Sequence, residues 1–147
     1  MRKALATISA LLICLASFSQ VSLEEVSSRL GSNRIRAEFS CNCDTGGAPL
    51  SYKGVITAQR SCFHSDINGV EAFCDGKKLI LLDRENREAY IENAAGLEEY
   101  LRANASRISS LRFSELRYSD ISEDLSEFSF DLSTLGADWV VTDLREE

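Results

Sequence analysis

The chain has 147 residues, of which 16 are Lys or Arg and 23 are Asp or Glu, so its formal charge is −7 at pH 7. An acidic chain without a basic run lacks the electrostatic signature of a nucleic-acid-binding protein, or of one held on an anionic membrane surface. Its length suits one domain with a hydrophobic core and is short for two.

The N-terminus has the three regions of a secretory signal peptide. Arg2-Lys3 precedes an uncharged, largely apolar run from Ala4 to Ala16. Ser17-Phe18-Ser19 then provides a cleavage site before Gln20. We therefore expect residues 1–19 to be removed during export.

Two alternatives to a cleaved signal peptide are a membrane span and a lipid anchor. A span needs about 20 apolar residues, more than this run contains. Lipidation of Cys14 would anchor the protein, but it needs a small residue where Ile13 stands. Cleavage removes Arg2 and Lys3, which takes the formal charge from −7 to −9. The expected product is a single exported domain at 20–147.

A helix is predicted to begin at Leu23, because Ser22-Leu23-Glu24-Glu25 is a capping box. Gly31 ends it. Leu23, Val26 and Leu30 recur at helical spacing and form one apolar stripe. This stripe suits packing on a sheet or lying across the mouth of a cavity.

The first predicted strand runs from Arg34 to Cys43 and alternates between two faces. One face is apolar and carries Ile35, Ala37, Phe39, Cys41 and Cys43. The other is polar and carries Arg36, Glu38, Ser40 and Asn42. If the sheet curls toward a barrel, its apolar face becomes concave and can enclose a ligand.

The stretch from Tyr52 to Asp83 reads as four short antiparallel strands at the centre of a sheet. Turns are predicted at Arg60-Ser61, at the three-residue loop Ile67-Asn68-Gly69 and at Asp75-Gly76. Leu79 to Leu82 is an unbroken apolar run, which indicates a strand covered on both faces.

Further elements follow in the last third of the chain. Glu88 to Glu92 completes a hairpin with Leu79 to Asp83. Asn93 is placed to cap a second helix, whose apolar stripe is Leu97, Tyr100 and Leu101. That helix either covers a cavity or packs on the sheet. The remaining predicted strands are Leu111 to Tyr118, Leu125 to Phe130 and Trp139 to Thr142.

The chain contains several short motifs whose order along the sequence is informative. They are Gly54, Arg60, Phe63 and Cys74-Asp75-Gly76-Lys77, with Ile35 to Ser40 upstream and Phe128 to Asp131 and Val140 to Arg145 downstream. In this order they resemble the LolA family, the periplasmic carriers of outer-membrane lipoproteins. The resemblance covers most of the chain after the signal peptide.

The resemblance implies an α+β fold, in which a curved antiparallel sheet forms an incomplete, half-open β-barrel and two helices cover its concave apolar face. It implies a monomeric periplasmic carrier that takes an acylated lipoprotein, or another acyl lipid, from an inner-membrane donor to an outer-membrane acceptor. No enzyme activity and no cofactor are expected. The expected lining residues are Ile35, Ala37, Phe39, Ile56, Ala58, Phe63, Leu79 and Leu81.

Arg60 aligns with a family arginine that holds the lid shut by donating hydrogen bonds to the helices. The alternative interpretation of Arg60 is an exposed charge in a turn. For the whole chain, the alternative is a reduced scaffold of the same fold without a lipid cavity, acting as a protein-interaction or lipid-sensing module. Its basis is the stretch between Ile91 and Phe128, which is shorter than in the family.

Four cysteines follow the expected signal peptide, and their spacing bears on possible disulfide or redox chemistry. A three-residue hairpin loop would place Cys62 and Cys74 nearly opposite each other, so we expect a disulfide between them in an oxidising compartment. Cys41 and Cys43 are neighbours on one strand face and cannot easily bond to each other without buckling it. They are either a redox pair or apolar thiols.

His64 lies near Cys62 and Asp66 in the sequence, which raises the hypotheses of a thiol nucleophile or a metal site. Both lack the further ligands or the orienting group that such sites need. No catalytic or phosphate-binding motif occurs in the sequence. We therefore predict neither catalytic nor metal-binding residues.

Overall fold

The computed structural model describes residues 23–44, 46–94 and 108–145. Within these ranges the chain forms one helix, two single-turn 3-10 helices and eight strands. The elements are α2 (Leu23–Arg29), β1 (Arg34–Cys43), β2 (Leu50–Gln59), β3 (Cys62–Ile67), β4 (Val70–Cys74), β5 (Lys78–Asp83), β6 (Glu88–Asn93), β7 (Ile108–Ser119), η2 (Ser126–Phe128), η3 (Leu132–Thr134) and β8 (Val140–Asp143).

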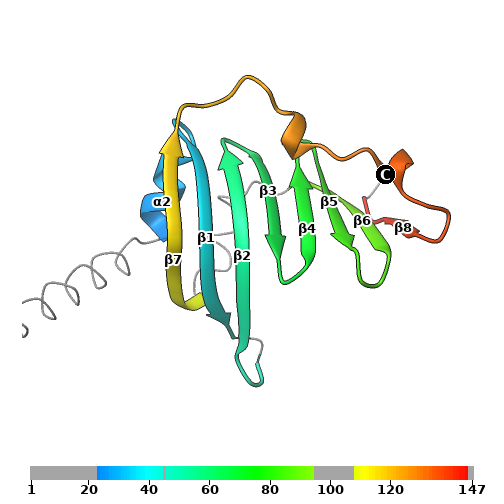
Figure 1. The fold of residues 1–147 in the computed structure, drawn as a ribbon, viewed down its shortest axis with the longest axis horizontal. Helices are drawn as coiled ribbons and strands as arrows, with labels where there is room; N and C mark the ends of the chain where they lie inside the picture. Colours follow the sequence, from blue (N-terminus) through cyan, green and yellow to red (C-terminus); the bar gives the residue numbers. More distant parts are fainter. Residues whose placement is uncertain (1–22, 45, 95–107, 146–147) are drawn as a thin grey trace, which may run out of the picture.

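The eight strands form one curved, unclosed sheet in the order β7-β1-β2-β3-β4-β5-β6-β8 (Figure 1). Every neighbouring pair is antiparallel except β6 and β8, which are parallel. The expectation of a single curved, mainly antiparallel sheet is confirmed. Among the described residues, no helix has the length and apolar character needed to cross a bilayer.

The predicted elements match the observed ones closely up to residue 93. β1 has the predicted bounds, and α2 begins at Leu23 as its capping box indicates. The predicted strand Leu125 to Phe130 is wrong, because this stretch contains the 3-10 turn η2 and irregular chain. Asn93 ends β6, and the helix expected after it lies outside the described residues.

The loop between β3 and β4 contains two residues instead of the expected three. Ile67 pairs with Val70, so that only Asn68 and Gly69 turn, both at positive φ (51° and 82°). The Asn68 side chain accepts a hydrogen bond from the Lys53 backbone N–H at 2.9 Å, which ties the turn to β2. Asn and Gly tolerate this left-handed conformation best, and it suits a tight hairpin.

This register overturns the expected disulfide. Phe63, not Cys62, lies opposite Cys74, because the loop is one residue shorter than expected. Cys62 and Cys74 are both buried free thiols, and the Cys74 thiol lies 3.5 Å from the Ser61 carbonyl oxygen. Since paired residues share a face, Cys62 belongs to the opposite side of the sheet from Cys74.

Each side of the sheet is covered by a different part of the chain. On one side α2 packs Val26 and Leu30 against Ile35, Ala58 and Phe63. We call this side the apolar face. The other side, the opposite face, is covered over β3 to β6 by residues 120–145, the C-terminal segment. Figure 1 shows this segment running from β7, at one edge of the sheet, to β8, at the other.

The C-terminal segment is held on the opposite face by aromatic packing. Phe128 is fully buried, and Phe130 contacts Phe73 with ring centroids 5.2 Å apart. Further along, Leu132, Leu135 and Trp139 pack on the cluster of Ile80, Leu82 and Ala89. The segment therefore covers apolar side chains that would otherwise be exposed to water.

A buried glutamine fixes the start of this segment. The Gln59 side chain is 1% exposed and bonds both backbone groups of Ser122: its Nε2 donates to the carbonyl at 2.8 Å, and its Oε1 accepts from the N–H at 3.0 Å. Arg34 also reaches Gln59 Oε1 at 3.5 Å and forms an ion pair with Glu127. The buried amide of Gln59 needs hydrogen-bond partners, because water is excluded there. Its bonds to Ser122 therefore fix the path of the chain after β7.

Gly54 pairs with Ile67 of β3, and the space above its Cα is occupied. A Cβ at this position would lie 2.8 Å from the Asp66 carbonyl oxygen and 2.9 Å from Ile67 Cγ1. The first of these atoms belongs to the backbone, so β3 itself would have to move. The glycine is therefore required by space and not by its backbone dihedral angles.

Substituting Gly54 with Ala should lower the free energy of unfolding by about 1–3 kcal/mol, the usual cost of overpacking. Gly47→Ala is the matched control, because a Cβ there meets no atom within 4 Å. Urea unfolding followed by the fluorescence of Trp139 measures both variants. Equal midpoints for Gly54→Ala and Gly47→Ala would show that β3 yields freely to the methyl group.

Candidate functional site

All eight predicted lining residues lie on the apolar face of the sheet. Ile35 of β1 pairs with Ala58 of β2, and Ala58 pairs in turn with Phe63 of β3. The three side chains therefore point to the same side of the sheet. Ala37 lies opposite Ile56 in the same way. Because directly paired residues point to the same side, the register alone brings these side chains together.

The register also assigns the two faces of β5, which the sequence left open. Cys74 pairs with Leu79, and Ala72 pairs with Leu81, so both leucines point to the apolar face. Ile80 and Leu82 point to the opposite face, beneath the C-terminal segment. The unbroken apolar run therefore belongs to a strand that is covered on both sides.

The apolar face is filled at one end and more open at the other. Ile35, Ala58 and Phe63 are buried in the cluster that contains Val26 of α2. Ala37, next to them in the sheet, is buried as well. Phe39 is half-buried and lies further along β1. Ile56, Leu79 and Leu81 are also half-buried and pack against the cluster under α2.

β7 contributes apolar side chains that the sequence analysis did not include. Tyr118, Leu116 and Phe113 lie opposite Ile35, Ala37 and Phe39 respectively. A register shift after Glu38 moves Phe113 into phase with the other two. Simple alternation misses this, because a bulge adds one residue and reverses the faces beyond it.

Tyr118 lies close to α2 at the filled end. The guanidinium of Arg29 lies 4.5 Å above its ring, a cation–π contact. Its hydroxyl is buried and has no hydrogen-bond partner among the described residues. Burial raises the pKa of this phenol, and the nearby Arg29 lowers it in part.

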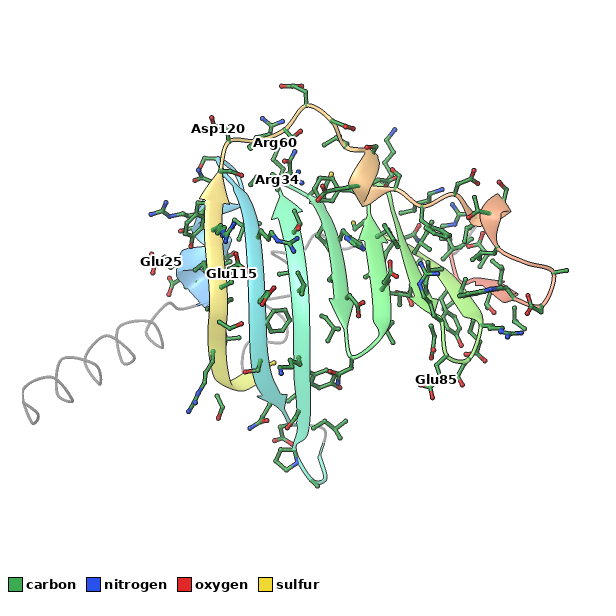
Figure 2. The ribbon with its side chains drawn as sticks, in the orientation of Figure 1. Glu25, Arg34, Arg60, Glu85, Glu115 and Asp120 are labelled. Carbon is green, nitrogen blue, oxygen red and sulfur yellow. The ribbon has the colours of Figure 1, made fainter. Side chains whose placement is uncertain are left out.

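Arg60 contacts the helix through its backbone. It adopts a positive φ of 52°, and its N–H donates to the Leu30 carbonyl at 2.6 Å, just beyond the end of α2. The side chain is exposed, and the guanidinium has no hydrogen bond or ion pair with another described residue. Figure 2 shows Arg60 at the same end of the sheet as Arg34 and Asp120. Its proposed role as a lid lock remains a prediction.

The four described cysteines form two separate groups. Cys41 and Cys43 are half-buried on the apolar face near the open end. Burial raises the pKa of the Cys41 thiol, and the neighbouring Cys43 raises it further. Cys62 and Cys74 lie at the α2 end, where burial is the main cause of their raised pKa values. Such thiols react slowly as nucleophiles.

His64 belongs to a cluster with Glu71 and Phe73 on the opposite face. Its ring stacks on Phe73 with centroids 4.5 Å apart, and its Nε2 lies 3.4 Å from Glu71 Oε2. The other carboxylate oxygen of Glu71 accepts a hydrogen bond from Arg84 at 2.7 Å. In the described part of the chain, no three potential metal ligands come together.

Comparisons with known proteins name no family for this chain. No protein-family model matches the sequence. No curated protein matches it either. The features of this chain that point to a function are the geometry of its apolar face and the order of its short motifs.

The Glu71 cluster predicts a pH dependence of stability. The hydrogen bond from Arg84 holds the pKa of Glu71 below its ordinary value of 4.5, against the opposing effect of burial. A lowered carboxyl pKa stabilises the fold above the ordinary value, and this stabilisation is lost as the pH falls through the lowered one. Glu71→Gln should therefore lower stability at neutral pH, and the deficit should shrink below pH 4.5.

Urea midpoints measured across this pH range provide the test. Glu85→Gln is the control, since Glu85 is exposed in the turn next to Arg84 (Figure 2). It should follow the wild type at every pH. A deficit for Glu71→Gln that stays constant down to acidic pH would show that the charge of Glu71 contributes nothing.

Proposed function

We propose that this chain is an exported carrier that binds the acyl chains of lipoproteins, or of a related lipid, on its apolar face. One observation supports this most strongly: the eight expected lining residues share one face of a curved, unclosed sheet. The opposite face is occupied over β3 to β6 by the chain's own C-terminal segment. The apolar face is therefore the side on which a ligand can be accommodated.

Acyl chains supply enough binding energy for such a carrier. Burying a methylene group contributes about 0.8 kcal/mol relative to water, so a single chain of ordinary length can be held while the carrier crosses an aqueous space. The half-buried side chains of Phe39, Ile56, Leu79 and Leu81 offer the matching apolar surface. The carrier would receive its cargo from an inner-membrane donor and release it to an outer-membrane acceptor.

The proposed lid has two parts. α2 covers the filled end of the apolar face through Val26 and Leu30. The second part is the helix expected after Asn93, whose predicted apolar stripe is Leu97, Tyr100 and Leu101; it lies outside the described residues. Together they would form the two helices over a half-open barrel that the resemblance to the LolA family implies.

The alternative function is a scaffold without a lipid cavity, acting as a protein-interaction or lipid-sensing module. The packing under α2 favours it, because Val26 and Leu30 already fill the space over Ile35, Ala58 and Phe63. The two functions differ in whether the rest of the face admits an acyl chain.

Phe39→Asp tests the binding surface. A carboxylate placed on the apolar face should weaken the retention of a fluorescent fatty acyl probe, because burying an unpaired charge is costly. Ser40→Asp is the matched control: it adds the same charge one residue away, on the other face, between Lys53 and Arg112. We expect at least tenfold weaker binding for Phe39→Asp and unchanged binding for Ser40→Asp.

The outcomes separate the two functions. Probe retention by the wild type and by Ser40→Asp, with loss in Phe39→Asp, supports the carrier. A wild type that retains no probe supports the scaffold. Equal loss in both variants would mean that the added charge acts through overall electrostatics and not through the apolar face.

Arg60→Leu tests the lid. The backbone bond from residue 60 to Leu30 does not depend on the side chain, so α2 should stay docked and acyl binding should be kept or tightened. If the guanidinium helps to close and release the lid, transfer of the probe to acceptor vesicles should slow by about tenfold, the scale of one charge-assisted hydrogen bond. Arg36→Leu, an exposed arginine on the other face, is the control. Identical transfer rates for the two variants would make Arg60 an ordinary turn charge.

A further inference from the structure

Cys41 and Cys43 occupy successive positions on the apolar face of β1. They pair across β2 with Tyr52 and Leu50, and both thiols are free and half-buried. Because they are two residues apart on one strand, their side chains point to the same side of the sheet. The pair therefore presents two accessible sulfur donors on one side of a strand, in largely apolar surroundings.

The spacing of the pair rules out a disulfide within β1. Side chains two residues apart on a strand stand roughly 6.6–6.8 Å from each other, two steps of about 3.3–3.4 Å. A disulfide needs its Cβ atoms only about 3.5–4.5 Å apart. Bonding Cys41 to Cys43 would thus require β1 to buckle, although it is paired on both sides, to β2 and to β7.

The same spacing suits two sulfur atoms joined through a metal ion. A metal–sulfur bond of about 2.3 Å, the value for zinc, separates two bridged sulfur atoms by roughly 4.6 Å, which removes the need for close approach of the Cβ atoms. Zinc itself takes four ligands in a structural site. Cu(I) prefers soft thiolates and is satisfied by two of them in a linear arrangement.

We propose that Cys41 and Cys43 bind one Cu(I) ion as a pair of thiolates at the open end of the apolar face. Each thiol loses its proton, two sulfur–copper bonds form, and the oxidation state of the metal does not change. The bound site carries one net negative charge. This site is independent of the acyl-binding proposal and stands or falls separately.

The local structure around the pair fits such a site. β7 has a register shift opposite Cys41, where two residues face one and Ser110 adopts a positive φ of 52°. A bulge of this kind bends its strand locally and changes the direction of nearby side chains. On the other flank, Cys41 pairs with Tyr52 and Cys43 with Leu50, so neither cysteine has a charged side chain directly opposite it on β2.

The other two described cysteines provide an internal control. β2 runs from Leu50, which pairs with Cys43, to Gln59, which pairs with Cys62, so the two groups of cysteines lie at opposite ends of this strand. That separation is on the order of 30 Å at about 3.3 Å per residue. A single ion cannot bridge the two groups.

The test titrates the full-length exported protein, reduced and free of oxygen, with Cu(I) in the presence of the chromophoric chelator bicinchoninate. We expect one Cu(I) to be retained per chain. Cys41→Ser and Cys43→Ser should each weaken retention by more than the roughly 10–100-fold that loss of an outer-shell partner costs. Cys62→Ala and Cys74→Ala should retain copper as the wild type does.

Circular dichroism of each variant confirms that it is folded, and X-ray absorption of the wild type counts the sulfur neighbours of the copper. Two sulfur neighbours, together with loss of copper in both serine variants, support the site. Undiminished copper retention in Cys41→Ser or Cys43→Ser overturns it. Equal loss in Cys62→Ala or Cys74→Ala overturns it too, as does retention of Zn(II) with an affinity matching that of Cu(I).

Discussion

The structure depends on a strand that is apolar on both faces. Leu79 and Leu81 of β5 point to one side of the sheet and Ile80 and Leu82 to the other, so both sides must be covered. In the part of the chain that the structure describes, two segments cover them, one before the sheet and one after β7. α2 comes before the sheet and packs on the apolar face, while the C-terminal segment follows β7 and crosses the opposite face. β8 can pair in parallel with β6 only because this crossing carries the chain from one edge of the sheet to the other.

Because of this crossing, the two faces of the sheet are covered to different extents. Gln59 anchors the segment at Ser122, the segment's own Phe128 is fully buried, and its Phe130 extends the stack of His64 on Phe73. Polar anchoring and aromatic packing thus occupy the opposite face over β3 to β6. The apolar face, by contrast, is filled at the α2 end and only half-buried around Phe39, Cys41 and Cys43. The proposed acyl-binding surface and the proposed copper site are neighbours there, because Phe39, Cys41 and Cys43 are successive residues on one face of β1.

The sequence predicted most of the strands and the lining residues because both depend on local pattern. Alternation in β1 and β2 placed Ile35, Ala37, Phe39, Ile56 and Ala58 on one face, and turn residues marked the hairpins. The predicted pairing and faces were wrong where a loop or a strand has one residue fewer or more than simple alternation assumes. The loop at Asn68-Gly69 is a residue shorter than expected, which moved Cys62 away from Cys74. The shift in β7 brought Phe113 onto the apolar face against simple alternation.

By itself, then, the sequence determined the strand order up to β6, the existence of α2 and the apolar character of one face, since each follows from periodicity over neighbouring residues. Only the tertiary structure decided which leucines of β5 face which side, that residues 125–130 form a covering turn instead of a strand, and that Arg60 meets the helix through its backbone N–H. These outcomes depend on contacts between segments distant in the chain, such as Gln59 with Ser122. The pattern of neighbouring residues cannot predict these contacts. A buried polar group is stabilised by its hydrogen-bond partner, and here that partner comes from a distant part of the chain.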